Sequence, residues 1–196
     1  MLSITSNLET VYCKYGFGKL DSGHEFTLAP LWDSEHDCWA RLNYRDSLIA
    51  LDRLGMRMPT FNELDQIASR EDAIILQPVT LVRTKEDSLK MGSWEFWQKH
   101  DAKVEKQIAD REWDEKTPLV SVGKHWAAGA PAGRAWLHGW YLPKKDKLGN
   151  IIPGYSGIIQ KRGTSAHDNK HLDYSSTIIC VSKEIKKDKE INFPNC

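Results

Sequence analysis

The densest group of chemically active side chains lies between residues 167 and 176, where the sequence reads HDNKHLDYSS. His167 and Asp173 are its best-suited pair for proton transfer, because a carboxylate that holds one imidazole nitrogen leaves the other to exchange a proton. Tyr174 and Ser175 follow directly, and the Ser175 hydroxyl is a candidate nucleophile. An apolar stretch at 177–181 comes next, so a rigid strand would anchor the loop that exposes these groups. We therefore expect His167, Asp173, Tyr174 and Ser175 to be catalytic.

The same segment could instead hold a metal ion. His167, His171 and Asp173 offer two imidazoles and a carboxylate, a ligand set that zinc accepts. The spacing H-x-x-x-H-x-D is not specific for metal sites, and a solvated loop is the more common fate of so polar a segment. Zinc is therefore the candidate cofactor, and its ligands stay undetermined.

The chain is rich in tryptophan, with eight in 196 residues. Indole rings stack on sugar faces and on peptides, but they also fill cores, and core packing is the default for most of them. Trp126, Trp136 and Trp140 gather on strands expected in the C-terminal half, and His138 lies between the last two. Gly139 relaxes the strand beside His138, so a ligand could approach the backbone there. We expect the three tryptophans and His138 to contact substrate.

Two helix starts precede these groups in the chain. Asn43 is suited to cap a helix that Gly55 would end, with Leu48, Leu51 and Leu54 as its apolar stripe.

The second helix begins almost at once after the first. Thr60 and Glu63 have the spacing of a capping box, in which each residue hydrogen-bonds the backbone of the other. Phe61, Leu64 and Ile67 would form the buried face of this short helix.

The remaining pattern predicts one longer helix and several strands. Ser93 can cap a helix that runs to about residue 112, and strands are expected at 73–76, 119–126, 135–142 and 175–181. Together these elements predict an α+β fold, with an N-terminal helical unit and one longer helix packed on a mostly antiparallel sheet. Residues 1–182 would form a single globular domain, and residues 183–196 a charged C-terminal arm.

Composition excludes several classes of function. Lysine plus arginine number 27 and aspartate plus glutamate number 27, so the chain lacks the basic field that most nucleic-acid binders use. The apolar runs are too short for a membrane span, and we expect no membrane insertion. The N-terminus shows no signal peptide, which predicts a protein that is cytoplasmic as synthesised. The four cysteines form no C-x-x-C pair, so we expect free thiols.

The order of motifs resembles that of a group of small bacterial and phage proteins, which end in H-x5-D-Y-S-H-G followed by a hydrophobic strand. The motifs are R-M-P-T-x-x-E-x-D at Arg57–Asp65, His100, Lys124, Gly139-Trp140, Ile159-Gln160, His167 and Asp173–Ser175. The resemblance covers residues 40 to 182 and implies a layout rather than a reaction. It adds Lys124 to the candidate catalytic residues and Gln160 to the candidate substrate contacts. Ser176 stands where the group has histidine, and His171 has no counterpart in it.

Two shorter resemblances concern the same motifs. The segment R-M-P-T-x-x-E is similar to R-L-P-T-E-x-E-W of formylglycine-generating-enzyme-like, lectin-type folds. The D-Y-S-H-G ending of that group is similar to the S-H-G-C ending of L,D-transpeptidases, which act on peptidoglycan, although Cys180 lies too far along the strand to match their nucleophile.

Three functions are compatible with these observations. The first is a cell-wall hydrolase of the phage-lysis type, which would cleave peptidoglycan at a site centred on His167 and Asp173. The second is a non-catalytic module that binds a saccharide or a peptide through its tryptophans. The third is an intracellular phage or host accessory protein that acts on another protein. The sequence does not determine the oligomeric state.

Overall fold

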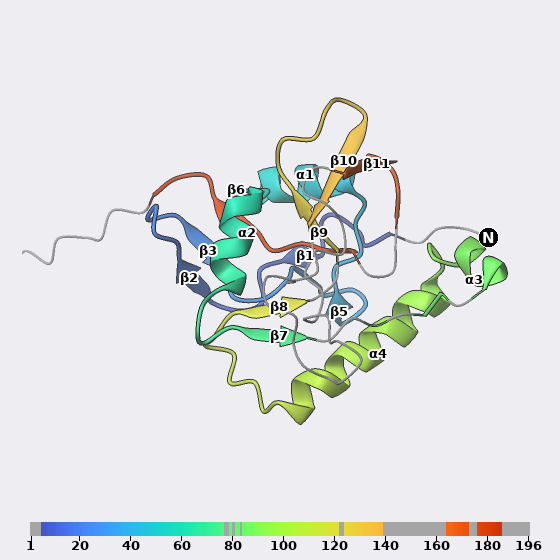
Figure 1. Cartoon of the computed structure of the whole chain (residues 1–196), viewed down its shortest axis with the longest axis horizontal. Helices are drawn as coiled ribbons and strands as arrows, with labels where there is room; N and C mark the ends of the chain where they lie inside the picture. Colours follow the sequence, from blue (N-terminus) through green and yellow to red (C-terminus); the bar gives the residue numbers. More distant parts are fainter. Residues whose placement is uncertain are drawn as a thin grey trace, which may run out of the picture.

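The computed structural model describes residues 5–76, 79, 81–82, 84–121, 124–138, 164–172 and 176–185. Four helices occur in this part of the chain: α1 (Tyr44–Arg53), α2 (Phe61–Ala68), α3 (Lys85–Leu89) and α4 (Trp94–Asp110). Figure 1 shows α4 along one side of the molecule, with α1 and α2 on other sides of the strands. None of the four combines the length and the apolar character that crossing a bilayer requires.

The strands of the described residues form three antiparallel or mixed sheets and one parallel pair. The first sheet is antiparallel and contains β1 (Val11–Tyr12), β4 (Trp32–Asp33) and β5 (Cys38–Trp39). The second is also antiparallel, in the order β2 (Phe17–Lys19), β3 (Glu25–Thr27), β13 (Val181–Ser182) and β6 (Met56–Arg57). The third has the order β11 (Thr164–Asp168), β10 (Arg134–His138), β9 (Lys124–Ala127) and β12 (Ser176–Thr177), with β9 and β12 parallel. The parallel pair is β7 (Ile74–Leu76) with β8 (Leu119–Ser121). The predicted α+β fold is confirmed.

Each of the three larger helices packs on its own group of buried apolar side chains. Leu51 of α1 lies in a cluster with Trp126 and Leu137 of the third sheet. On α2, Leu64 and Ile67 pack in a second cluster, which includes residues of β3 and β13. The third cluster joins α4 to β5, β7 and β8, through residues such as Trp97, Trp39, Leu76 and Leu119.

Helix α1 begins as predicted but buries a different face. The Asn43 side chain accepts a hydrogen bond from the Asp46 backbone N–H at 2.9 Å. However, Leu48 is 44% exposed, and the buried residues are Tyr44, Ser47, Ala50 and Leu51. Ser47 can be buried because its hydroxyl donates to the Asn43 carbonyl at 2.7 Å. The buried face of α1 is therefore partly polar. The prediction that Leu48 belongs to the buried face was wrong.

Two stretches that the sequence predicts as single strands are each divided between two sheets. Of the stretch predicted at 119–126, the described residues belong to β8 and β9, which pair with different partners. Of the stretch predicted at 175–181, the described residues belong to β12, to the start of β13 and to the buried link of Ile178, Ile179 and Cys180 between them. The backbone of this link stays paired, because the Ile178 and Cys180 carbonyls accept from the N–H groups of Leu31 and Thr27. An apolar run thus crosses between sheets with these buried backbone carbonyls hydrogen-bonded.

The capping box of α2 is present and provides a test of the local fold. The Thr60 hydroxyl accepts from the Glu63 N–H at 3.3 Å, and the Glu63 carboxylate accepts from the Thr60 N–H at 2.8 Å. We expect Thr60→Ala to lower the free energy of unfolding by about 1 kcal/mol. Thr84→Ala removes the same box from α3, which buries no residue, and should have a smaller effect. Denaturant unfolding of both variants checks this; equal midpoints for Thr60→Ala and the parent would contradict it.

Candidate functional site

Helix α2 and strand β10 bring together a carboxylate and an imidazole that are 73 residues apart. His138 Nε2 lies 2.7 Å from Asp65 Oδ1. The His138 side chain is fully buried, whereas 32% of the Asp65 side chain is exposed. Of the two side chains, the Asp65 carboxylate is therefore the one exposed to solvent.

The start of α2 determines which side chains face β10. Phe61 and Asp65 are four residues apart, so they lie one turn apart on the same side of the helix. Leu64 and Ile67 of the same helix are buried against the second cluster, which fixes the helix rotation. The capped helix thus presents an aromatic ring and a carboxylate together.

An aromatic pair adjoins the carboxylate. The rings of Phe61 and Trp136 stack with their centroids 5.2 Å apart and their planes 26° apart, and the Phe61 ring is also 5.3 Å from that of His138. Trp136 and His138 are two residues apart on β10, so they share a face of the sheet. Gly129 has φ +98°, and a Cβ there would lie 2.7 Å from the Trp136 ring. The loop therefore requires glycine in order to hold the indole in place.

A second imidazole lies beside His138 on the same face. His125 of β9 is the direct cross-strand partner of His138, and Thr177 of β12 is the next partner in the row. His125 Nδ1 and Thr177 Oγ1 share a hydrogen bond of 3.0 Å, and both residues are buried. Thr177 also borders a small, mainly apolar cavity lined by Trp97 and His100. This row of polar groups can relay or fix protons inside the fold, away from the open surface.

The predicted catalytic histidine lies on the other face of the third sheet. His167 of β11 pairs with Ala135, which alternates with Trp136 and His138 along β10. Its ring stacks on that of His171, with the centroids 4.0 Å apart and the planes 21° apart. The structure thus brings the two histidines of the predicted zinc set into contact but keeps His167 apart from His138.

Several predicted site residues lie outside the described residues. These are Asp173, Tyr174, Ser175, Trp140 and Gln160, so the catalytic pair of His167 with Asp173 stays a prediction. The backbone of Lys124 pairs with Ser176, and its side chain is outside the described part. Trp126 is fully buried, and its indole N–H donates to the Leu42 carbonyl at 3.1 Å. In this structure Trp126 is a core side chain, whereas Trp136 is only partly buried.

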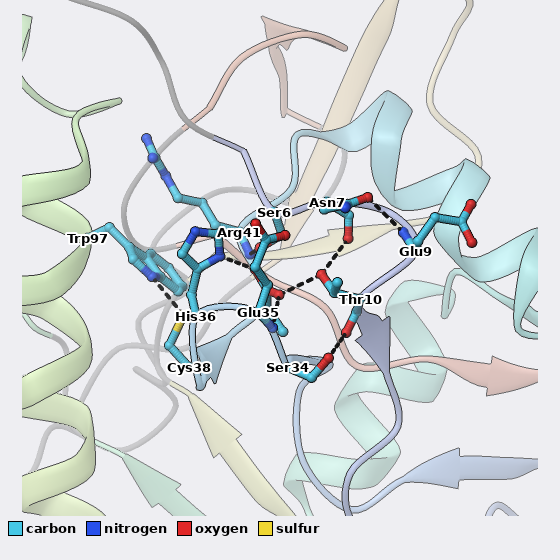
Figure 2. Close-up of polar contacts among 11 residues, drawn as sticks. Ser6, Asn7, Glu9, Thr10, Ser34, Glu35, His36, Cys38, Arg41 and Trp97 are labelled. Atoms are coloured by element: carbon cyan, nitrogen blue, oxygen red, sulfur yellow. Dashed lines mark hydrogen bonds and ion pairs between the residues drawn. The ribbon is translucent and has the colours of Figure 1, made fainter.

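Among the described residues, one group of three offers closely spaced metal-ligand atoms: Asp33, Glu35 and His36. Figure 2 shows the hydrogen bonds around this group. The buried Asp33 carboxylate accepts from Thr10 Oγ1 at 2.7 Å and from the Glu35 N–H at 3.0 Å, and it lies 2.8 Å from His36 Nδ1. Burial raises the pKa of Asp33, but hydrogen bonds from Ser6, Thr10 and His36 outweigh it and lower the pKa overall. A metal would have to displace these bonds, so the group serves to join the N-terminal segment to β4.

Two of the three cysteines of the described residues are buried thiols of raised pKa. Cys13, Cys38 and Cys180 are free thiols, which confirms the sequence prediction for these three, and Cys196 lies outside the described part. Burial raises the pKa of Cys38 to about 11, and it also raises the pKa of Cys180 well above its usual range. Cys13, whose Sγ lies 3.9 Å from that of Cys180, has a lowered pKa because the Cys180 thiol hydrogen-bonds to it. Buried thiols of high pKa are poor nucleophiles.

Sequence reasoning missed Phe61, Asp65, His125 and Thr177 as site residues. Asp65 closes the R-M-P-T-x-x-E-x-D motif, and His125 adjoins Lys124, so both belonged to motifs that the sequence offered. No local pattern signals that Asp65 meets His138, because the two belong to elements distant in the chain.

A double-mutant cycle on Asp65 and His138 tests whether the pair is a real constraint. Asp65→Ala leaves the buried imidazole without this acceptor, and we expect a coupling free energy with His138→Ala of about 1 kcal/mol. Arg70→Ala with Asp72→Ala is the matched control, because that pair is similar in length but lies at the surface. Its coupling should be near zero. Chemical denaturation measures both cycles, and the account of the site fails if Asp65 and His138 couple no more than the control.

Comparison with known proteins adds no assignment. No family model, no curated protein and no solved structure matches this chain. The function must therefore be argued from the geometry of the site.

Proposed function

We propose that this protein is a saccharide-binding module, and that Asp65 and the stacked rings of Phe61 and Trp136 form its contact surface. The observation that carries the proposal is the unequal burial of the Asp65–His138 pair, in which the carboxylate is 32% exposed and the imidazole fully buried. The contact surface combines a polar acceptor with aromatic rings. Sugar rings need both, because they present hydroxyl donors at their edges and apolar C–H groups on their faces.

Burial distinguishes a binding role from a catalytic one at this pair. A general base must come within hydrogen-bond distance of the proton that it removes. His138 offers no exposed surface, so a polymer cannot approach it without rearrangement. Asp65 can be approached, and the bond from His138 holds its carboxylate in one orientation. The imidazole is thus a positioning residue, and the carboxylate is the group that contacts ligand.

The aromatic part of the surface is already arranged for stacking. The Trp136 ring lies between Gly129 and Phe61, at 5.2 Å from the Phe61 ring. Both side chains are only partly buried. A ring that is fixed before the ligand arrives loses little conformational entropy on binding, which favours affinity.

The experiment is calorimetric titration with soluble β-1,4-linked oligomers of N-acetylglucosamine, which are analogues of the peptidoglycan glycan. Asp65→Asn removes a charged acceptor and Trp136→Ala removes the stacking surface, and each should weaken binding by about tenfold. Trp94→Ala is the matched control, because Trp94 is also partly buried but packs on His36. Its affinity should equal that of the parent. Unchanged affinity in Asp65→Asn and Trp136→Ala, with both variants folded, would overturn the proposal.

Peptidoglycan hydrolysis of the phage-lysis type is the second candidate. The groups suited to proton transfer favour this function. The Asp65–His138 pair lies beside the Thr177–His125 pair, because His138 and His125 are cross-strand partners. Mass spectrometry of peptidoglycan after incubation with the protein separates the two functions. A binding module leaves the polymer intact, whereas a hydrolase releases fragments. If fragments appear, loss of turnover in His138→Gln assigns the reaction to this site, and loss in His167→Ala or Asp173→Asn assigns it to the other face.

A further inference from the structure

A second aromatic group lies at the first sheet, which supplies two of its four rings, and apart from the proposed saccharide surface. It consists of Tyr15, Trp32, Trp39 and Trp113, which we call the ring cluster. Tyr15 is at its centre, with its ring 4.8 Å from Trp113, 5.9 Å from Trp39 and 6.3 Å from Trp32. Trp32 and Trp39 meet edge to face at 5.0 Å. Tyr15 and Trp113 are partly buried, so the cluster reaches the surface.

The chain places one of its own cations on this cluster. Lys14 Nζ lies 3.5 Å from the centroid of the Trp32 ring and 5.5 Å from that of Tyr15. An ammonium over an indole face is attracted by the negative face of the ring, and the attraction is strongest for tryptophan. Lys14 is an exposed residue next to Tyr15 in the chain, so its side chain can move away without unfolding the cluster.

Carboxylates surround the rings and make the position electronegative. Burial and, after it, the charges of Glu105, Glu115 and Asp37 raise the pKa of Tyr15 to about 12. Burial likewise raises the pKa of Glu105, the Trp39 side chain and the charge of Lys14 lower it, and the charge of Asp37 raises it. Three carboxylates thus act on Tyr15, and Lys14 is the cation placed over its ring. Such a field favours a cation over a neutral ligand.

We propose that the ring cluster is a binding site for organic ammonium ions, and that Lys14 occupies it until a ligand displaces the lysine side chain. The walls are Tyr15 and Trp32, and Glu105 supplies the counter-charge. A quaternary ammonium group is the preferred ligand. Its methyl groups fill more of an aromatic surface than a primary ammonium does, and it gives up less hydration on leaving water. The proposal does not depend on the saccharide site, because none of its residues belongs to α2 or to the third sheet.

The probe is tetramethylammonium, measured by calorimetry at constant ionic strength. Lys14→Met keeps an unbranched side chain one atom shorter than lysine but removes its charge, so the competitor is lost and affinity should rise about tenfold. Glu105→Gln should weaken binding several-fold. Lys106→Met is the matched control, because Lys106 pairs with Asp110 on the exposed side of α4, and its affinity should equal the parent's.

Comparison of choline with a neutral compound of the same shape distinguishes recognition of the cation from apolar packing. 3,3-Dimethyl-1-butanol carries a tertiary-butyl group in place of the quaternary ammonium and should bind at least tenfold more weakly than choline. The proposal is overturned if the alcohol binds as well as choline. It is also overturned if Lys14→Met binds tetramethylammonium no more tightly than the parent. Because Lys14 is exposed, Lys14→Gln provides a second variant that keeps the fold and should show the same gain.

Discussion

A buried imidazole needs a hydrogen-bond partner, and His138 finds one in Asp65, which belongs to a helix 73 residues earlier in the chain. Together with the burial of Leu64 and Ile67, this bond holds α2 against β10. Phe61 lies one turn before Asp65, and Trp136 lies two residues before His138, so the contact between helix and strand brings their rings together. The exposed part of the candidate site thus follows from a buried polar contact beneath it.

The first turn of α2 supports the same arrangement from the other end. Glu63 completes the capping box and also pairs with Arg57 of β6, at 2.6 Å for the shorter of its two hydrogen bonds. Burial raises the pKa of Glu63, but the Arg57 and Thr60 contacts outweigh it and lower the pKa overall, so the carboxylate is charged at neutral pH. Helix α2 is therefore anchored to the second sheet by its start and to the third sheet by Asp65. The stacked rings of Phe61 and Trp136 lie between these two contacts.

Local features of the fold could be predicted from the sequence, because their causes lie within a few residues. The caps at Asn43, Thr60 and Ser93 each satisfy backbone N–H groups within the next turn, and all three are present. The assignment of β8 and β9 to different sheets could not be predicted, since Gly123 and Lys124 interrupt the apolar pattern but nothing local names the partner of either strand.

The candidate site was less predictable for the same reason. Trp126 and Trp136 look alike in sequence, but Trp126 packs in the first cluster and donates to the Leu42 carbonyl, and these partners are far away in the chain. Asp65 was part of a recognised motif, but its partner His138 is set by the packing of α2 on the sheet. Burial of that partner, which decides between a base and a positioning residue, is a property of the whole fold.

The central claim is that ligand binds at Trp136 and not at the other tryptophan of the third sheet. Indole N–H signals of the ¹⁵N-labelled protein, followed by NMR during titration with N-acetylglucosamine oligomers, test it most directly. We predict that the Trp136 signal shifts and saturates, while the Trp126 signal stays fixed, because its N–H is bonded to Leu42 inside the core. Binding that leaves the Trp136 signal unchanged would contradict the account.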